Sequence, residues 1–228
     1  MDDTLLDTSG GLEAAWEASC RAHALALGCD WDQVRQAIRR EAMEFWRDEA
    51  AVGHWRVRLH EARIHIIEKA LAAEGLDATR ARQINDRYMD EARQRWRLFD
   101  DALVTLESLR TEGYRLALLT NGPADMQREK IARFELERHF DTVVIEGVFG
   151  HGKPNREVFE HALAATGTDA GQAWHVGDNL YADIGGAKNA GLHAVWIHRE
   201  RLEMQEDVVV MPDRVIGHLA ELRASLAD

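Results

Sequence analysis

Between about Gly11 and Arg97, apolar and polar positions repeat at the spacing of amphipathic helices, with no Pro and few Gly. The pattern predicts four helices. Glycine and small polar residues predict three breaks between them, near Gly28 to Trp31, Asp48 to Gly53 and Gly75 to Thr79. Asp77 or Thr79 is expected to cap the last helix. This segment is therefore predicted to be all-α.

From about Leu98 onward, short runs rich in Leu, Val and Ile alternate with amphipathic helical stretches. The runs are Leu116 to Leu119, Val143 to Ile145, Trp174 to Val176 and Ala194 to Ile197. This alternation predicts an α/β fold with a parallel sheet covered by helices. Ligands of such sheets bind beyond the carboxyl ends of the strands, so the residues after each run are the candidates for chemistry.

The charge of the chain narrows the classes of partner. Lys and Arg number 28 against 40 Asp and Glu, which gives a formal net charge of −12. A field of that sign repels nucleic acid, so no nucleic-acid partner is expected. A small anionic substrate remains possible because a local Lys, helix N-termini and a metal ion act at short range.

The cysteines and the start of the sequence bear on its location. Cys20 and Cys29 are the two cysteines, and they form neither a CxxC pair nor a metal-ligand spacing. A reducing cytosol fits that usage best. The sequence has no run of about 18 apolar residues, and it opens with acidic residues. We therefore expect a cytoplasmic protein without a membrane partner.

The loop after the first apolar run reads Thr120-Asn121-Gly122-Pro123. It supplies a hydroxyl, an amide and main-chain N–H groups at the start of a helix, where an oxyanion can bind. The same residues also suit an ordinary strand-to-helix turn. The motif alone does not separate these two interpretations.

A second candidate is Gly152-Lys153-Pro154, ahead of a helix predicted to begin near Arg156. A rigid Pro and a Gly flank the Lys. A fixed cation at this place can neutralise a phosphoryl group and a carboxylate nucleophile. The alternative is a surface turn with a solvated Lys. His151 is interpreted as a loop residue and not as a ligand.

The most specific segment runs from Trp174 to Gly191 and contains Gly177-Asp178 and Asp183. Asp178 follows a predicted strand, and Asp183 falls in the first turn of the next helix, so the two carboxylates are expected to converge on one hard cation. Oxygen ligands without His or Cys favour Mg²⁺ over zinc. An acidic helix N-terminus also occurs for dipole reasons alone, which is the alternative.

Together with Asp2-Asp3-Thr4-Leu5-Leu6-Asp7-Thr8 at the start, these segments resemble the four motifs of the haloacid dehalogenase (HAD) superfamily, in order and across the whole chain. The resemblance implies a Rossmann-like parallel sheet core, residues 1–10 and 98–228. It also implies an inserted all-α cap, residues 11–97. The branch it resembles includes phosphoglycolate phosphatase-like, nucleotidase-like and 2-haloacid dehalogenase-like members.

The first motif of that family is an apolar strand ending in Asp-x-Asp, in which the first Asp is the nucleophile and the second the general acid/base. Phasing on Asp3-Thr4-Leu5 makes Asp2 the acid/base, Met1 the intervening residue, and the nucleophile a residue ahead of Met1. The alternative phasing, with Asp2 as nucleophile, loses the Asp-Thr-Leu match. We expect the natural protein to begin upstream with an apolar strand and an Asp. A pseudoenzyme with a rebuilt sheet is the rival.

The resemblance also implies roles for the site residues. The nucleophilic Asp would form an aspartyl-phosphate, and Asp2 would protonate the leaving oxygen and then activate water. Mg²⁺ would be held by Asp178, the nucleophile and the main-chain carbonyl of Asp2, with Asp183 in support. Lys153 and the segment Thr120-Asn121-Gly122 would bind the phosphoryl oxygens. In the family's scheme Lys153 also orients the nucleophile.

The expected function is Mg²⁺-dependent hydrolysis of a phosphomonoester, with a small phosphorylated metabolite as partner and the chain a monomer or homodimer. Two alternatives stay open. A 2-haloacid dehalogenase-like hydrolase needs no Mg²⁺ and generally lacks the paired acids, so Asp178 and Asp183 argue against it. An inactive member would keep phosphate binding without turnover.

Overall fold

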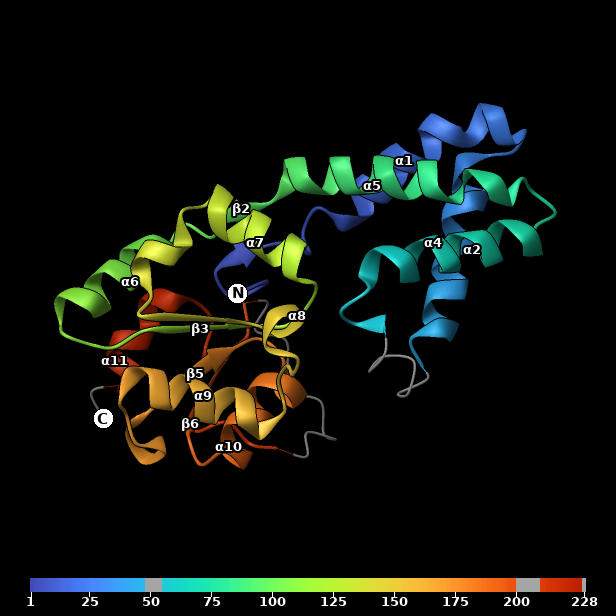
Figure 1. Cartoon of the computed structure of the whole chain (residues 1–228). Helices are drawn as coiled ribbons and strands as arrows, with labels where there is room; N and C mark the ends of the chain where they lie inside the picture. The colour runs from blue at the N-terminus through green and yellow to red at the C-terminus, as the bar shows by residue number, and fades with distance from the viewer. Residues whose placement is uncertain (48–54, 200–209, 227–228) are drawn as a thin grey trace. The chain divides into compact units, whose positions relative to one another are not determined.

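The computed structural model describes residues 1–47, 55–199 and 210–226, and the chain divides into two compact units (Figure 1). The core unit combines Met1–Leu6 with Leu98–Asp228, and the helical unit spans Asp7–Arg97. The predicted break near Asp48 to Gly53 lies outside the described residues. Each unit has its own apolar core.

The helical unit consists of helices, as its hydrophobic periodicity predicts. They are α1 (Leu12–Leu27), α2 (Trp31–Phe45), α4 (Leu59–Ala73), the short 3₁₀ turn η1 (Ala78–Arg80) and α5 (Ala81–Arg95). Gly28 ends α1 in a left-handed conformation with φ 69°. Asp77 caps η1 by accepting a hydrogen bond from the Thr79 N–H at 3.1 Å. The predicted breaks at Gly28 and near Asp77 are both observed.

The apolar faces of these helices meet in one cluster. Val34, Ile67, Leu71 and Ile84 are completely buried there. The rings of Trp16 on α1 and Tyr88 on α5 stack with centroids 3.9 Å apart. Burial of aliphatic side chains at helical spacing on α2, α4 and α5 is what holds this unit together.

The core unit carries the strands. The strands are β1 (Leu6–Asp7), β2 (Arg97–Leu98), β3 (Ala117–Thr120), β4 (Thr142–Ile145), β5 (Trp174–Gly177), β6 (His193–Ile197) and β7 (Arg214–Ile216). β3 pairs with β4 in parallel, and β6 pairs in parallel with β5 and β7. β1 and β2 form a two-stranded sheet where the chain passes between the units. The predicted α/β class with parallel strands is confirmed.

Helices cover both faces of these strands. They are α6 (Ala102–Thr111), α7 (Ala124–Arg133), α8 (Glu146–Phe149), α9 (Arg156–Thr166), the π-helical turn η4 (Leu180–Gly185), α10 (Gly186–Asn189) and α11 (Leu222–Leu226), with 3₁₀ turns η2 (Leu136–His139), η3 (Ala170–Gln172) and η5 (Leu219–Glu221). Neighbouring strand residues belong to opposite clusters: Leu118 packs with α6, whereas Leu119 packs with α9. The sheet is therefore buried on both faces, as parallel sheets usually are.

Besides the β1–β2 pair, the described strands form two separate parallel sheets, β3–β4 and β5–β6–β7. Among the described residues, β3 pairs only with β4, and β5 pairs only with β6. A cavity of about 400 Å³ is lined by residues of both β3 and β5 and closed by residues of α6 and α9.

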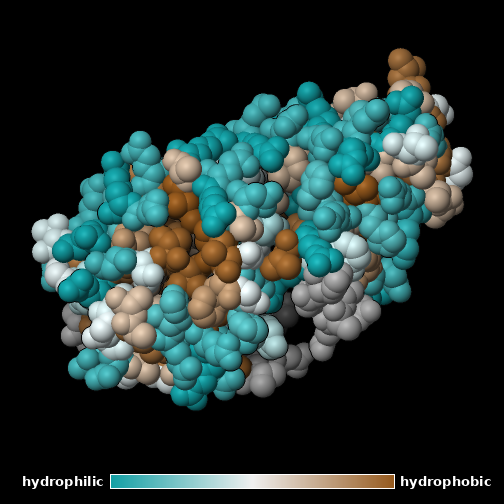
Figure 2. All heavy atoms as spheres, in the orientation of Figure 1, coloured by the Kyte–Doolittle hydropathy of each residue, from teal (hydrophilic) through white to brown (hydrophobic). Residues whose placement is uncertain are grey.

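The face of the molecule seen in Figure 2 is mainly polar. Figure 2 shows teal atoms over most of the viewed face and brown apolar atoms gathered in a smaller patch. The described helices include none that is both long and apolar enough to cross a membrane. Cys20 and Cys29 are both free thiols.

Candidate active site

The carboxyl end of β5 leads to a buried ion pair. Asp183, on η4, is 3% exposed, and its Oδ1 lies 2.5 Å from Lys153 Nζ and 2.8 Å from His175 Nε2. Its Oδ2 accepts a hydrogen bond from the Asn179 N–H at 3.1 Å. Burial would raise the pKa of Asp183, but the charge of Lys153 and the contact with His175 hold it far below the ordinary value. Asp183 is therefore ionised and bound to Lys153.

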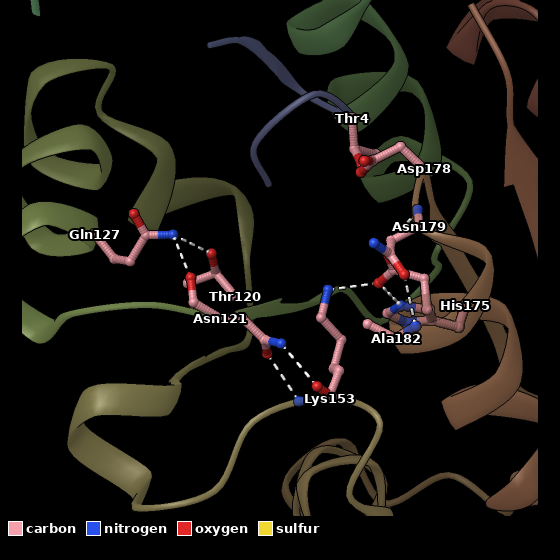
Figure 3. Close-up of polar contacts among 10 residues, drawn as sticks. Thr4, Thr120, Asn121, Gln127, Lys153, His175, Asp178, Asn179 and Ala182 are labelled. Carbon is pink, nitrogen blue, oxygen red and sulfur yellow. Dashed lines mark hydrogen bonds and ion pairs between the residues drawn. The ribbon is translucent and has the colours of Figure 1, made fainter. Parts of the chain in front are cut away.

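Asp178 lies next to this pair but bonds differently (Figure 3). The Thr4 hydroxyl donates to Asp178 Oδ1 at 2.8 Å, and the Trp196 indole N–H donates to the Asp178 carbonyl at 2.8 Å. Burial and the nearby negative charge of Asp183 raise the pKa of the Asp178 carboxyl. Lys153 neutralises Asp183, so Asp178 is the acid of this pair whose ionised form is disfavoured.

Lys153 is held in place by Asn121. The Asn121 Nδ2 donates to the Lys153 carbonyl at 2.7 Å, and the Lys153 N–H donates to Asn121 Oδ1 at 2.8 Å. The Gly122 N–H donates to Glu146 Oε2 at 2.9 Å. In Figure 3, the Lys153 side chain extends from this loop toward His175 and Asn179. The loop after β3 and the loop before α9 are thus joined into one polar frame.

Thr120 belongs to a second group of polar contacts. Gln127 Nε2 donates to Thr120 Oγ1 at 2.5 Å and to Asp2 Oδ2 at 3.0 Å. Lys130 Nζ lies 2.8 Å from both carboxylate oxygens of Asp2. Burial would raise the pKa of Asp2, but the charge of Lys130 holds it below the ordinary value. In this conformation Asp2 is an ionised partner of Lys130.

The sequence-derived site residues thus gather at the carboxyl ends of β3 and β5. Thr120, Asn121 and Gly122 follow β3; Asp178 and Asp183 follow β5; and Lys153 links the two ends. The Asp2 carboxylate lies with Lys130 and Gln127. Within the part of the chain that the structure describes, no three His, Cys, Asp or Glu side chains gather as a metal-binding group.

Sequence reasoning did not identify Gln127, Lys130 and Glu146 as parts of the site. Each is 5% exposed or less. Gln127 and Lys130 are three residues apart and so lie on one face of α7, which is otherwise a polar helix. That spacing, directly after Thr120-Asn121-Gly122, was the available signal. Glu146 follows β4 directly, so the strand-end rule applied to that run would have found it.

Replacing Lys130 by Met is expected to lower the free energy of unfolding by about 2 kcal/mol at pH 7, because the partly buried Asp2 carboxylate loses its charged partner. Since the folded-state pKa of Asp2 is depressed, this stabilisation is full above the ordinary carboxyl pKa and is lost as pH falls through the folded value. Urea unfolding at pH 7 and pH 3 checks both statements. The Lys130→Arg variant keeps the charge, so its free energy of unfolding should stay close to that of the parent. An equal deficit at both pH values would contradict the ion-pair explanation.

Comparisons with known proteins show the family of the chain. Residues 1–191 match the family model described as haloacid dehalogenase-like hydrolase. A phosphoserine phosphatase of Thermus thermophilus is 39% identical over 242 residues, covering 97% of this chain and 95% of that protein. The solved HAD phosphatase of Thermococcus onnurineus aligns with a TM-score of 0.70 and 27% identity over 99% of this chain and 94% of its own.

A solved 2-haloacid dehalogenase of Pseudomonas syringae is also similar, with 29% identity and a TM-score of 0.66 over 100% of this chain and 95% of its own. The family model covers most of the sequence, and the phosphatase relative is matched over nearly its full length. The chain belongs to the haloacid dehalogenase-like hydrolase family and is a hydrolase whose curated relatives include phosphatases.

Proposed function

We propose that this protein hydrolyses phosphomonoesters of small metabolites with the help of Mg²⁺. The observation that carries the proposal is the buried Lys153 ammonium, fixed beside Asp183 and Asp178 at the carboxyl end of β5. A cation held at that point by Asn121 can stabilise the charge that develops on a transferred phosphoryl group. The pair of carboxylates beside it suits a hard metal ion.

The residues at this place fit Mg²⁺ on electrostatic grounds. The raised pKa of Asp178, caused by burial and by the charge of Asp183, means that a bound cation would favour its ionised form. Asp178 would hold the ion, Asp183 would support the site, and Asp2 would contribute its main-chain carbonyl. When bound, Mg²⁺ supplies Lewis-acid stabilisation of the phosphoryl oxygens.

The protein's own residues would divide the remaining work. Thr120 offers its hydroxyl and Asn121 its main-chain N–H group to the phosphoryl oxygens, while Lys153 neutralises charge. The Gly122 N–H is held by Glu146 and shapes the loop. Asp2 would act as general acid and base. Because Lys130 depresses the pKa of Asp2, the carboxyl must leave Lys130 before it can carry a proton at neutral pH.

We further propose that the helical unit, residues 11–97, is the cap and that residues 1–10 and 98–228 form the catalytic core. The curated relatives support a small phosphorylated metabolite as the substrate, since one is a phosphoserine phosphatase and another, 30% identical, is the mouse N-acylneuraminate-9-phosphatase. A cytoplasmic location and a monomeric or homodimeric state belong to the same proposal.

The proposal is tested on the protein purified from its native source. Release of inorganic phosphate from a panel of phosphomonoesters, including phosphoserine, is measured with Mg²⁺ and after chelation. We expect turnover that requires Mg²⁺. Binding of inorganic phosphate without turnover would favour the inactive alternative.

Replacing Asp178 by Asn in the active form is expected to lower turnover by about 100-fold or more, because a ligand of the metal and its charge are lost. The loss should be partly restored at high Mg²⁺ concentration. Asp169→Asn, at an exposed position before η3, is the matched control and should leave turnover unchanged. Equal turnover in the parent and in Asp178→Asn would remove Asp178 from the proposed metal site.

A carbon–halogen hydrolase is the second candidate, and the similarity to a solved 2-haloacid dehalogenase favours it. That reaction would release halide from a 2-haloacid without Mg²⁺. Halide release that survives chelation, in a sample without phosphatase turnover, would support it. The pair of Asp178 and Asp183 weighs against it, because a hydrolase that needs no metal ion has no role for a second carboxylate beside the first.

A further inference from the structure

Arg199, just after β6, is held on three sides within the core unit. Its Nη2 donates to the Thr4 carbonyl at 2.7 Å and lies 3.3 Å from Asp101 Oδ1. Its Cζ lies 3.4 Å from the centroid of the Phe99 ring. The side chains of Arg199 and Asp101 are each 16% exposed. A guanidinium with an anionic partner, an aromatic neighbour and a carbonyl acceptor has little freedom to move.

Thr4 is the link between Arg199 and Asp178. Thr4 is 5% exposed, and its hydroxyl donates to Asp178 Oδ1 at 2.8 Å (Figure 3). Within the described part of the chain, no other side chain bonds the Asp178 carboxylate. The main chain of Thr4 decides where its hydroxyl lies, and Arg199 holds that main chain by its carbonyl. The orientation of the Asp178 carboxylate therefore depends on Arg199 through Thr4.

The end of β6 also holds the main chain of Asp178. Trp196, on β6, donates its indole N–H to the Asp178 carbonyl at 2.8 Å. Arg199 follows three positions later. One short segment thus fixes Asp178 twice, its main chain directly and its carboxylate through Thr4. Hydrogen bonds that orient a metal-binding carboxylate raise its affinity for the ion.

The influence of Arg199 on Asp178 is one of position and not of charge. Asp101 neutralises the guanidinium, and the Leu219 N–H fixes Asp101 by donating to its Oδ2 at 2.6 Å. The bond to Thr4 goes to a carbonyl, which carries no net charge. The buried Nε of Arg199 has no hydrogen-bond partner among the described residues, which costs stability. Arg199 thus keeps its bond to Thr4 at the expense of complete pairing.

We propose that Arg199 is a positioning residue of the metal site: it fixes Thr4, and the Thr4 hydroxyl orients the Asp178 carboxylate for binding the ion. The presence of Mg²⁺ at Asp178 rests on the proposed function. The dependence of the Asp178 orientation on Arg199 does not, because every contact in this chain of bonds is made by the protein alone.

The first test uses crystal structures of the metal-free full chain. In the parent and in Asp101→Asn, we expect the Thr4 hydroxyl to stay within about 3.2 Å of Asp178 Oδ1. In Arg199→Met we expect this contact to be lost. Asp101→Asn is the matched control, because it removes the ion pair and leaves the bond from Arg199 to Thr4. An unchanged contact in Arg199→Met would overturn the proposal.

The second test measures Mg²⁺ binding to the full chain by isothermal titration calorimetry. We expect the Kd to rise about tenfold in Arg199→Met and about threefold in Arg199→Lys, which keeps a donor but not the fork, and to stay unchanged in Asp101→Asn. Should Arg199→Met fail to fold, Arg199→Lys decides: a Kd equal to that of the parent would overturn the proposal.

A double variant shows whether Arg199 acts through Thr4. Thr4→Val alone should raise the Kd for Mg²⁺ about tenfold, because the hydroxyl that holds Asp178 is lost. Adding Arg199→Met should raise it no further, since the link is already broken. Effects that multiply to roughly a hundredfold would mean that Arg199 acts by another route and would overturn the proposal.

The two tests separate this role from the proposed function. A parent that binds no Mg²⁺, with the contact between Thr4 and Asp178 lost only in Arg199→Met, would contradict the proposed function and leave the positioning role standing. Equal Mg²⁺ binding by the parent and both Arg199 variants would contradict the positioning role alone. Turnover of Arg199→Met should approach that of the parent at saturating Mg²⁺, which a general loss of folded protein would not allow.

Discussion

Replacing Lys153 by Met is expected to lower the free energy of unfolding by about 3–5 kcal/mol at pH 7, the range seen when one partner of a buried ion pair is removed. The Asp183 carboxylate is 3% exposed, and its Oδ1 lies 2.5 Å from Lys153 Nζ, so water cannot replace the lost charge. His175 would remain as a partner, but burial lowers its pKa, which opposes the charged form.

Lys188→Met is the matched control for this variant. Lys188 pairs with Asp213 at 2.7 Å, and its side chain is 38% exposed. Exposed pairs contribute about 0–1 kcal/mol. Urea unfolding of both variants and the parent gives the comparison. Similar losses in the two variants would mean that Lys153 stabilises the fold no more than a surface Lys does.

The pH dependence of the Lys153→Met deficit provides a second measurement. The folded-state pKa of Asp183 is depressed, so its contribution is complete above the unfolded pKa of about 3.9 and declines as pH falls toward the folded value. The difference between the parent and Lys153→Met should therefore shrink below about pH 4. A deficit that stays constant down to pH 3 would point to packing by the Lys side chain, not to its charge.

Replacing Gly177 by Ala is expected to lower the free energy of unfolding by about 2–4 kcal/mol. A Cβ at Gly177 would lie 2.2 Å from the Asp183 Cγ, closer than any real contact, so Asp183 must move. Because that carboxylate also binds Lys153 and His175, the substitution should disturb both bonds. A lost Lys153–Asp183 pair would also appear as a changed pH dependence of stability.

Gly171→Ala serves as its control. An added Cβ at Gly171 meets no atom within 4 Å, and its φ does not lie in the left-handed region. The free energy of unfolding of Gly171→Ala should stay within about 0.5 kcal/mol of the parent's. Thermal and urea unfolding of both variants check the pair of predictions. If Gly177→Ala behaved like Gly171→Ala, the close approach of Asp183 to β5 would have to be relaxed in solution.

The longer elements and the ends of the central strands could be predicted from sequence. The run Val143 to Ile145 falls within β4, and the break after Gly28 and the start of α9 at Arg156 are where periodicity and helix signals put them. These features depend on local rules, namely side-chain period and backbone conformation. The haloacid dehalogenase-like family followed from motifs in order, and it is confirmed.

Contacts between residues far apart in the sequence could not be predicted from these local rules. β7 has three residues with no apolar run, and it pairs with β6 through main-chain bonds that any sequence can make. The partner of Asp2 is Lys130, 128 positions away, and sequence spacing carries no information about such a contact. The roles of Asp2, Thr120, Lys153, Asp178 and Asp183 remain proposals, although these residues gather at neighbouring strand ends.

The reciprocal bonds between Asn121 and Lys153 have a consequence for how a ligand binds. Two loops from distant parts of the sequence share one side-chain amide, which both donates to and accepts from the same residue's main chain. Asn121 thereby holds the Lys153 main chain, and Asp183 holds its ammonium group, before any anion arrives. Binding then immobilises fewer rotatable bonds, so a larger part of the electrostatic attraction appears as affinity.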